Sequence, residues 1–140
     1  MPSWYIHVIA NLIIFIPLLT LLKMFSLDLI ILIIAWGVLI DVDHLFYYFY
    51  KLRTFSFSKV LEYSNKDFIS DRPHFYLFHT IDFFLIFGIG LLVVNFDTTL
   101  SLLFLTGLIH WILDSIRHYI HHKNFSWLKY YSTFYYLLKK

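Results

Sequence analysis

Four long apolar stretches occupy most of this 140-residue chain and leave few ways for it to fold. They cover about residues 4–24, 27–50, 75–96 and 100–120. A helix needs about 20 apolar residues to cross the hydrocarbon core of a bilayer, whereas a barrel strand needs about 10. A backbone that faces lipid must also satisfy its own hydrogen bonds, which a helix does. The sequence therefore predicts an all-α integral membrane four-helix bundle.

The composition supports a membrane protein made of one folded unit. Hydrophobic residues make up 60% of the chain and charged residues 14%, against about 25% charged residues in soluble domains. No linker, low-complexity tract or internal repeat divides residues 1–140, so we expect one domain. The first residues lack the basic stretch and cleavage site of a secretory signal, so the first apolar segment is expected to remain as an anchor.

Basic side chains are distributed unequally between the ends of the four segments. Five of the 11 Lys and Arg residues lie in the loop at about 51–73 and five follow residue 116, whereas Lys23 lies at the opposite end. Because cytoplasmic loops carry the excess of Lys and Arg, we expect this loop and both termini in the cytoplasm. The chain is thus predicted to be a multi-pass protein of the inner or plasma membrane. Within the loop, the run SFSKVLEYSNKDF is typical of a short amphipathic helix at the interface.

Histidines and aspartates lie at the cytoplasmic end of every apolar segment. An Asp at the centre of a membrane helix costs about 2.5–3.5 kcal/mol, so ionisable groups in such segments are candidates for function. In an up-and-down bundle these ends are neighbours, which allows the side chains to converge. The chain has no Cys, so imidazole and carboxylate groups would hold any metal, and this favours zinc or a similar divalent ion. The candidate ligands are His7, Asp41, Asp43, His44, His74, His79, His110, Asp114 and His118.

His110, Asp114 and His118 recur every fourth residue in the last apolar segment. Successive helical residues turn by about 100°, so these side chains form a stripe on one helix face. A His and an Asp one turn apart make a good clamp for a metal ion. The alternative is a hydrogen-bonded His–Asp pair that neutralises two buried groups.

Asp41, Asp43 and His44 lie toward the end of the second apolar segment. Asp41 and His44 share a helix face, but Asp43 points about 200° away from Asp41 on a regular helix. One of the two carboxylates could serve a second metal, the helix could break there, or Asp43 could reach water near the helix end. Two carboxylates beside a metal cluster also supply a general base, so Asp41 and Asp43 are the candidate catalytic residues.

His74 and His79 lie at the start of the third apolar segment. Their spacing of five residues directs both to one site if His74 still lies in the loop. Asp82, three residues after His79, is expected to orient its imidazole, unless the two form a separate structural pair. Thr80 and Arg72 are further polar candidates, and the guanidinium of Arg72 suits a phosphate.

His7 is the one histidine of the first apolar segment. A lone histidine near the membrane interface is usually a packing residue. Its depth matches that of the other candidates, which favours a role in the same site. Asn11, one turn deeper on the same face, is a candidate helper.

Four short blocks along the chain resemble, in their order and spacing, those of a known family. They are His7, Asp41-x-Asp43-His44, His74-x4-His79-Thr80 and Gly107-x2-His110-x3-Asp114. Together they resemble the predicted inner-membrane metal-dependent hydrolases of the YdjM type, which are distantly akin to zinc-dependent phospholipases C and P1-type nucleases. The resemblance implies phosphoester hydrolysis with two or three divalent ions held by the matching histidines and aspartates. Phe75 and Tyr76 stand where the family commonly has Arg and Gly, and Ile116 and Arg117 where it commonly has Thr and Pro, so we expect different substrate contacts.

These observations predict a membrane-embedded, phospholipase-like hydrolase that acts on a phospholipid or other lipid phosphate at the cytoplasmic leaflet through a metal-activated water. A soluble phosphorylated small molecule could also reach such a site from the cytoplasm, and no nucleic-acid binding is expected. Two other functions stay open. One is a metal-ion carrier or sensor, which would need polar groups through the outer half of the bundle for conduction. The other is a non-catalytic structural bundle whose polar cluster satisfies itself.

Overall fold

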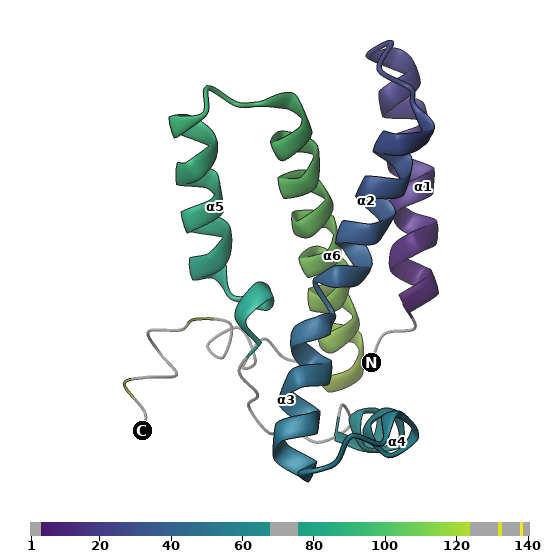
Figure 1. Ribbon diagram of the computed structural model, residues 1–140, viewed down its shortest axis with the longest axis vertical. Helices are drawn as coiled ribbons and strands as arrows, with labels where there is room; N and C mark the ends of the chain where they lie inside the picture. The colour runs from purple at the N-terminus through teal and green to yellow at the C-terminus, as the bar shows by residue number, and fades with distance from the viewer. Residues whose placement is uncertain (1–3, 68–75, 124–131, 133–137, 139–140) are drawn as a thin grey trace.

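The protein is all-helical over the residues that its computed structural model describes, which are 4–67, 76–123, 132 and 138 (Figure 1). This confirms the predicted all-α class. The elements are, in chain order, α1 (Trp4–Leu21), α2 (Leu27–Leu39), α3 (Val42–Leu52), α4 (Phe57–Asp67), the 3-10 helix η1 (Leu77–His79), α5 (Ile81–Val93) and α6 (Thr98–His122). Helices α1, α2, α5 and α6 come from the four apolar stretches, one from each.

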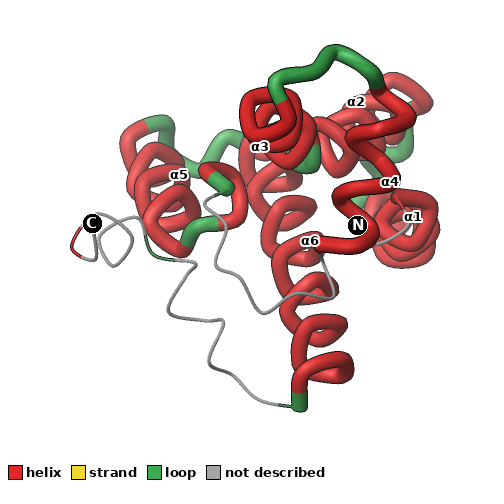
Figure 2. The backbone as a smooth tube through the Cα atoms, turned by 90° about the horizontal axis from the view of Figure 1, so that it is seen from below, coloured by secondary structure: helices red, strands yellow, loops and turns green. Residues whose placement is uncertain are grey.

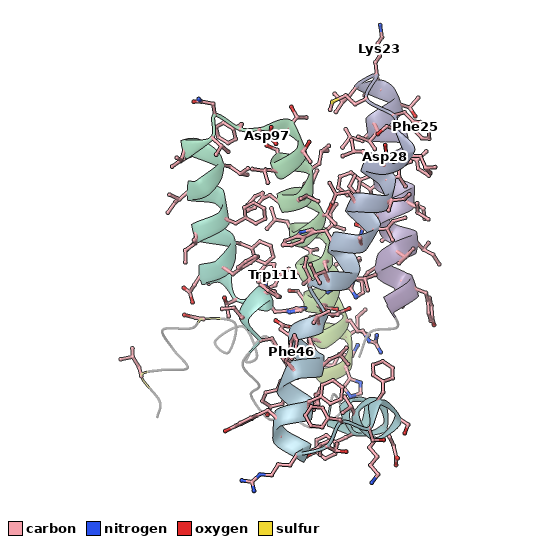
Figure 3. All side chains as sticks on the ribbon, viewed as in Figure 1. Lys23, Phe25, Asp28, Phe46, Asp97 and Trp111 are labelled. Atoms are coloured by element: carbon pink, nitrogen blue, oxygen red, sulfur yellow. The ribbon has the colours of Figure 1, made fainter. Side chains whose placement is uncertain are left out.

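Helix α6 lies at the centre of the bundle. It packs against α1, α2 and α5, and seen from the end that carries α3 it lies between α5 and the α1–α2 pair (Figure 2). The α1–α2 and α5–α6 connections lie at one end of the molecule, marked by Lys23, Phe25 and Asp97 in Figure 3. At the opposite end α3 continues beyond α2 and packs against α4. The apolar helices therefore alternate in direction, as an up-and-down bundle requires.

Side-chain caps fix where α2 and α6 begin at the connection end. Ser26 Oγ accepts a hydrogen bond from the amide N–H of Leu29 at 3.2 Å. Asp97 Oδ1 accepts one from the amide N–H of Leu100 at 2.9 Å. Such a cap stabilises a helix by about 1 kcal/mol. The connections are as short as the sequence predicts because a capping residue follows each apolar stretch within a few positions.

The second apolar stretch forms two helices in place of the single helix expected over 27–50. Ile40 and Asp41 separate α2 from α3. Here the backbone tightens, because the Asp41 N–H bonds to the Val38 carbonyl (3.1 Å) and the His44 N–H bonds to the Asp41 carbonyl (3.2 Å). Both bonds reach three residues back instead of four, as in a 3-10 turn. The residues after the break are therefore rotated relative to α2.

The third apolar stretch forms a shorter helix than the one expected over 75–96. Helix α5 has 13 residues, which corresponds to a length of about 20 Å. Its start is set by Thr80, whose hydroxyl donates to the Leu77 carbonyl at 2.9 Å and accepts the Phe83 N–H at 3.2 Å. The turn η1 precedes this cap, so the backbone changes direction before α5 begins.

Two helical segments are long and apolar enough to cross a membrane, Leu27–Leu52 and Thr98–His121. The first of them includes the tightened turn between α2 and α3. The apolar helices Tyr5–Leu21 and Ile81–Val93 are shorter. Among the described residues, helix length therefore supports two of the four expected spans.

The bundle exposes apolar side chains and buries polar ones. On the outside of α1 and α5, 68% of Ile13, 70% of Ile86 and 78% of Val93 is exposed. The apolar core, in the half of the bundle nearest the connections, consists of Phe15, Leu19, Ile33 and Leu102. The buried polar and charged residues are His7, Asn11, His79, Thr80, Thr106, His110 and Asp114. A buried polar set combined with exposed large apolar faces is the informative departure from an ordinary soluble domain.

Two glycines allow the helices around this polar set to approach one another. A Cβ at Gly37 of α2 would lie 2.5 Å from Nδ2 of Asn11 on α1. A Cβ at Gly107 of α6 would lie 2.9 Å from the ring of Phe84 on α5. Since His7 lies one turn from Asn11, the close approach of α1 and α2 also positions His7 near the centre of the bundle.

Candidate metal centre

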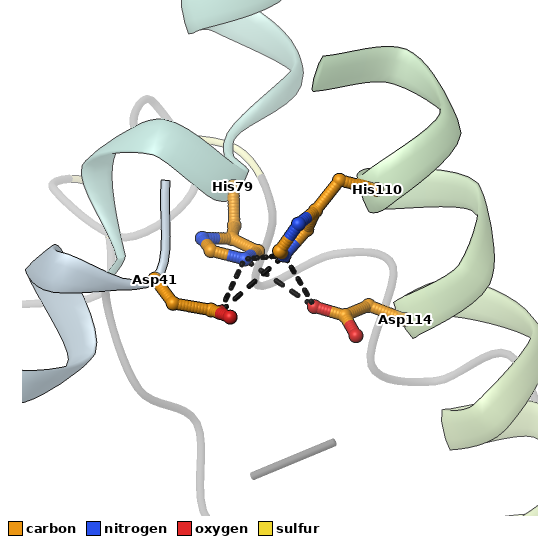
Figure 4. A group of neighbouring side chains, drawn as sticks. All are labelled: Asp41, His79, His110 and Asp114. Carbon is orange, nitrogen blue, oxygen red and sulfur yellow. Dashed lines mark hydrogen bonds and ion pairs between the residues drawn. The ribbon is translucent and has the colours of Figure 1, made fainter. Parts of the chain in front are cut away.

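Four ionisable side chains from three separate parts of the chain converge inside the bundle (Figure 4). Asp41 lies at the break between α2 and α3, His79 ends η1, and His110 and Asp114 lie one turn apart on α6. One nitrogen or oxygen atom of each lies within 4.8 Å of those of the other three. This set could hold a metal ion, and we call it the inner group.

The distances within the inner group match those between the ligands of a tetrahedral zinc ion. His79 Nε2 and His110 Nε2 are 3.3 Å apart. Asp114 Oδ2 lies 3.3 Å from His79 Nε2 and 3.5 Å from His110 Nε2. Asp41 Oδ1 lies 3.3 Å from His110 Nε2 and 3.8 Å from His79 Nε2. Zinc–ligand bonds of about 2.0–2.1 Å give ligand–ligand distances of about 3.3–3.4 Å in a tetrahedron, so the arrangement suits one divalent cation.

His79 is held in place by contacts with α3 and α6. The Nε1–H of Trp111 donates to the His79 carbonyl oxygen at 3.0 Å. Asp43 Oδ2 accepts the amide N–H of Phe78 at 2.9 Å and lies 3.5 Å from His79 Nδ1. A carboxylate near the second ring nitrogen is a usual partner of a metal-binding imidazole. These contacts fix η1 so that Nε2 of His79 faces the inner group.

Asp43, His44 and His79 form a second set that could hold a metal ion, which we call the outer group. His44 Nε2 lies 3.3 Å from His79 Nε2 and 3.8 Å from Asp43 Oδ1. His79 belongs to both groups, and because one ring nitrogen binds one cation, two cations would have to use its two nitrogens: Nε2 faces the inner group, and Nδ1 lies 3.5 Å from Asp43 Oδ2 of the outer group. The side chains of Asp43 and His44 are each 12% exposed, whereas that of His79 is 2% exposed. The side chain of Asp41 in the inner group is 13% exposed, so Asp41, Asp43 and His44 together form the more exposed side of the site.

The break between α2 and α3 explains how both carboxylates of the second sequence block come to face this site. A regular helix would direct Asp43 about 200° away from Asp41. The tightened turn rotates α3 relative to α2, and Asp41 lies in the inner group while Asp43 lies in the outer group. Two of the alternatives that the sequence left open thus occur together: the helix breaks, and Asp43 lies in a second metal-compatible group.

Buried carboxylate oxygens in both groups have no hydrogen-bond donor among the described residues. They are Oδ1 of Asp41, Oδ1 of Asp43 and Oδ1 of Asp114. Imidazole nitrogens lie near all three, but without the geometry of a hydrogen bond. A buried carboxylate oxygen that accepts no hydrogen bond is costly, and coordination of a cation would remove that cost. The ligand set of imidazole nitrogen and carboxylate oxygen is one that zinc and similar divalent ions accept, so the residues present fit such an ion.

His7 contacts the inner group from α1 but is not one of its four members. Its ring stacks on that of His110, with 3.8 Å between the ring centroids and 11° between the planes. Its Nε2 lies 3.3 Å from Asp114 Oδ1, the oxygen that does not face His79. Asn11 is also buried, and its amide nitrogen lies against Gly37 in the contact of α1 with α2. All four apolar stretches of the sequence therefore contribute a helix or an adjoining turn to the surroundings of the site.

The other candidates from the sequence do not join either group. Thr80 caps α5 through the two hydrogen bonds described above. Asp82 and His118 are half-buried and belong to neither the inner nor the outer group. His74 and Arg72 lie outside the described residues.

Sequence reasoning missed two aromatic residues that contact the site. Trp111 donates to the His79 backbone, and Tyr76 lies flat against His44, with 3.7 Å between the ring centroids. Trp111 directly follows His110, so on α6 its side chain points about 100° away from the ligand stripe. Its contact with His79 depends on where η1 lies, and the sequence carries no local signal for that position.

Comparison of the chain with protein-family models, curated proteins and solved structures finds no match. The family resemblance of the four sequence blocks therefore stays an expectation. A functional conclusion has to rest on the chemistry and geometry of the inner and outer groups.

Proposed function

We propose that this protein is a membrane-embedded metal-dependent hydrolase that cleaves a phosphoester of a phospholipid or other lipid phosphate at the cytoplasmic leaflet. The observation that carries the proposal is the pair of adjacent metal-compatible groups that share His79. Adjacent cations are typical of phosphoester hydrolysis, because together they stabilise the attacking and the leaving oxygen. The resemblance of the four sequence blocks favours the same reaction.

The helix lengths and the exposed apolar faces support a site in the cytoplasmic half of the bilayer. Asp41 lies 14 residues after Leu27, and His110 lies 12 residues after Thr98. These separations correspond to about 21 Å and 18 Å from the connection end of the bundle. With a hydrocarbon core of about 30 Å and the connections at its outer rim, the site would lie about 10 Å inside the inner rim. The exposed apolar faces of α1 and α5 suit contact with lipid at the same depth.

Divalent cations held by the two groups would supply an activated water and would neutralise the oxygens of a phosphate. The carboxylates of Asp41, Asp43 and Asp114 balance the charge of such cations. Asp43 is the proposed proton acceptor, because its Oδ2 is fixed by the Phe78 N–H while its buried Oδ1 accepts no hydrogen bond from a described residue. One oxygen thus holds the side chain in place, while the other faces His44 of the outer group, where an activated water would lie.

A substrate would approach from the side of Asp41 and His44, which is the more exposed side of the site. The side chains of Asp41 and His44 are 13% and 12% exposed, whereas that of His110 is fully buried. Helix α3 leads from this side to Lys51, in its last turn, and to Arg53 just beyond. Positive charge at this end favours the anionic headgroups of the cytoplasmic leaflet.

The two other functions predicted from the sequence are less well supported. An ion carrier needs polar groups along the whole path of the ion, but the half of the bundle nearest the connections is filled by apolar side chains. These side chains are Phe15, Leu19, Ile33 and Leu102. A purely structural cluster would satisfy its own polar atoms, yet three carboxylate oxygens have no donor among the described residues.

The proposal is tested on purified protein in lipid vesicles by counting bound zinc and measuring release of phosphate or headgroup from the vesicle lipids. We expect the wild type to bind at least two zinc ions and to turn over substrate. Asp43→Asn should keep the inner ion and lose about 100-fold or more in turnover, the usual contribution of a general base. Asp28→Asn, at an exposed aspartate of the connection end, is the matched control and should change neither quantity.

Two outcomes would contradict the proposal at different points. Unchanged zinc content in both His110→Ala and Asp41→Ala would show that the inner group does not bind the metal. Full turnover after a chelator has removed the ions would reject the metal-dependent mechanism but leave the fold and the ligand assignment untouched.

A further inference from the structure

The side chain of Tyr76 covers the imidazole of His44 in the outer group. The two rings are nearly parallel, with 3.7 Å between their centroids and 17° between their planes. Tyr76 directly precedes η1, whereas His44 lies in the first turn of α3. The stack therefore joins the two segments of the chain that supply the ligands of the outer group.

A hydrogen bond anchors Tyr76 at its far end. Its hydroxyl donates to the hydroxyl of Tyr48 at 3.0 Å. Tyr48 lies one turn after His44 on α3 and is 3% exposed. It also meets the ring of Tyr63 on α4 edge to face, with 5.9 Å between centroids. The ring of Tyr76 is thus held between His44 and a tyrosine that α3 and α4 keep in place.

This arrangement restricts the orientation of the His44 imidazole. A histidine that binds a cation must hold one ring orientation, and the loss of side-chain freedom opposes binding. The flat contact with Tyr76 hinders rotation of the ring and leaves Nε2 of His44 3.3 Å from Nε2 of His79. Neighbours that lock the rotamer of a ligand organise a site before the cation binds.

We propose that Tyr76 is a positioning residue for the outer group: it holds His44 in the orientation that binds the second cation, and it thereby sets the affinity of that cation. This inference rests on the proposed two-cation centre. The effect is confined to the outer group, because the inner group contains no atom of His44 and Tyr76 reaches the shared His79 edge-on, with 6.0 Å between centroids.

The test is a titration of the metal-free protein with Co²⁺, whose visible absorption reports each binding step. We expect the wild type to bind two equivalents of Co²⁺, one more tightly in the inner group and one more weakly in the outer group. Tyr76→Leu removes both the ring stack and the hydroxyl, and the weaker equivalent should lose about tenfold or more in affinity, as when a partner of a ligand is removed. Tyr76→Phe keeps the stack and loses the hydrogen bond, so its loss should be smaller, about threefold. The tighter equivalent should be unchanged in both variants.

A second variant removes the same hydrogen bond from the other side. Tyr48→Phe leaves Tyr76 intact, and we expect it to weaken the second equivalent as much as Tyr76→Phe does. Because both substitutions remove the same hydrogen bond, the double variant should bind the second equivalent with the same affinity as either single variant. Tyr50→Phe, at an exposed tyrosine of the same helix, is the matched control and should bind both equivalents as the wild type does.

Each remaining outcome overturns the inference. Wild-type affinity for both equivalents in Tyr76→Leu would show that Tyr76 does not position His44. An equal loss of both equivalents in Tyr76→Phe would indicate a general role in folding. If the wild type binds a single equivalent, the outer group is not a cation site, and the inner group is unaffected by this result. If the wild type binds none, the proposed metal centre itself is wrong.

Discussion

Replacing Gly37 by Ala tests whether α1 and α2 approach as closely as the site requires. A Cβ at Gly37 would lie 2.5 Å from Nδ2 of Asn11. Asn11 is buried, so its amide has no open solvent into which it could move. Gly90 of α5 provides the comparison, because a Cβ there would meet nothing within 4 Å. The same substitution is therefore made once in a crowded helix interior and once in open space.

The expected magnitudes follow from two opposing effects. Ala is about 1 kcal/mol more favourable than Gly inside a helix, so Gly90→Ala should raise the free energy of unfolding by about that amount. At Gly37 the same gain is opposed by overpacking, which costs about 1–3 kcal/mol. The two variants should thus differ by about 2 kcal/mol in the free energy of unfolding. At about 3 °C per kcal/mol, this difference corresponds to roughly 6 °C in the thermal midpoint.

The assay is thermal unfolding of both variants in the same detergent, followed by circular dichroism. Combining Gly37→Ala with Asn11→Ala removes the overlapping amide, so the double variant should recover most of the lost stability. A Gly37→Ala protein that is as stable as Gly90→Ala would refute the tight packing of the Asn11 amide against Gly37. It would also remove the reason for placing His7 beside the inner group.

Three further predictions concern the surroundings of the site and its response to metal. Trp111→Phe removes the donor to the His79 carbonyl, so it should lower the free energy of unfolding by about 1–3 kcal/mol. It should also lower the affinity for both cations in a calorimetric titration, and an unchanged affinity would contradict the positioning of η1 by Trp111. Thr80→Ala removes the cap of α5 and should lower the free energy of unfolding by about 1 kcal/mol, with an unchanged thermal midpoint as the contrary result. Zinc at a hundred times the Kd of the tighter site should add at least about 2.7 kcal/mol to the free energy of unfolding. A thermal midpoint that responds neither to zinc nor to a chelator would contradict a metal centre.

The helices could be predicted from the sequence because each depends on local information. The fourth apolar stretch carries its own cap at Asp97 and forms α6 over nearly the expected range. The amphipathic run in the loop forms α4 at Phe57–Asp67, and its position at a membrane interface stays a prediction. The spacing of His110 and Asp114 likewise placed both on one face of one helix, which is why this half of the inner group could be anticipated.

The remaining geometry depends on contacts between distant parts of the chain. Neither the tightened turn at Asp41 nor the turn η1 has a local signal as clear as Pro or Gly. The position of η1 relies on the Asp43 carboxylate that accepts the Phe78 N–H and on the Trp111 side chain that donates to the His79 carbonyl. Sequence patterns could therefore indicate which side chains meet, but not that they divide into two groups around one shared histidine.

The shared histidine gives the most direct test of the metal centre. His79 belongs to both the inner and the outer group, so a single substitution should affect both cations. Bound zinc is counted per chain in the wild type, in His79→Ala and in His121→Ala, the last at an exposed histidine of α6. We predict two ions in the wild type and in His121→Ala and none in His79→Ala at stoichiometric zinc. Retention of two ions by His79→Ala would contradict a centre built around this residue.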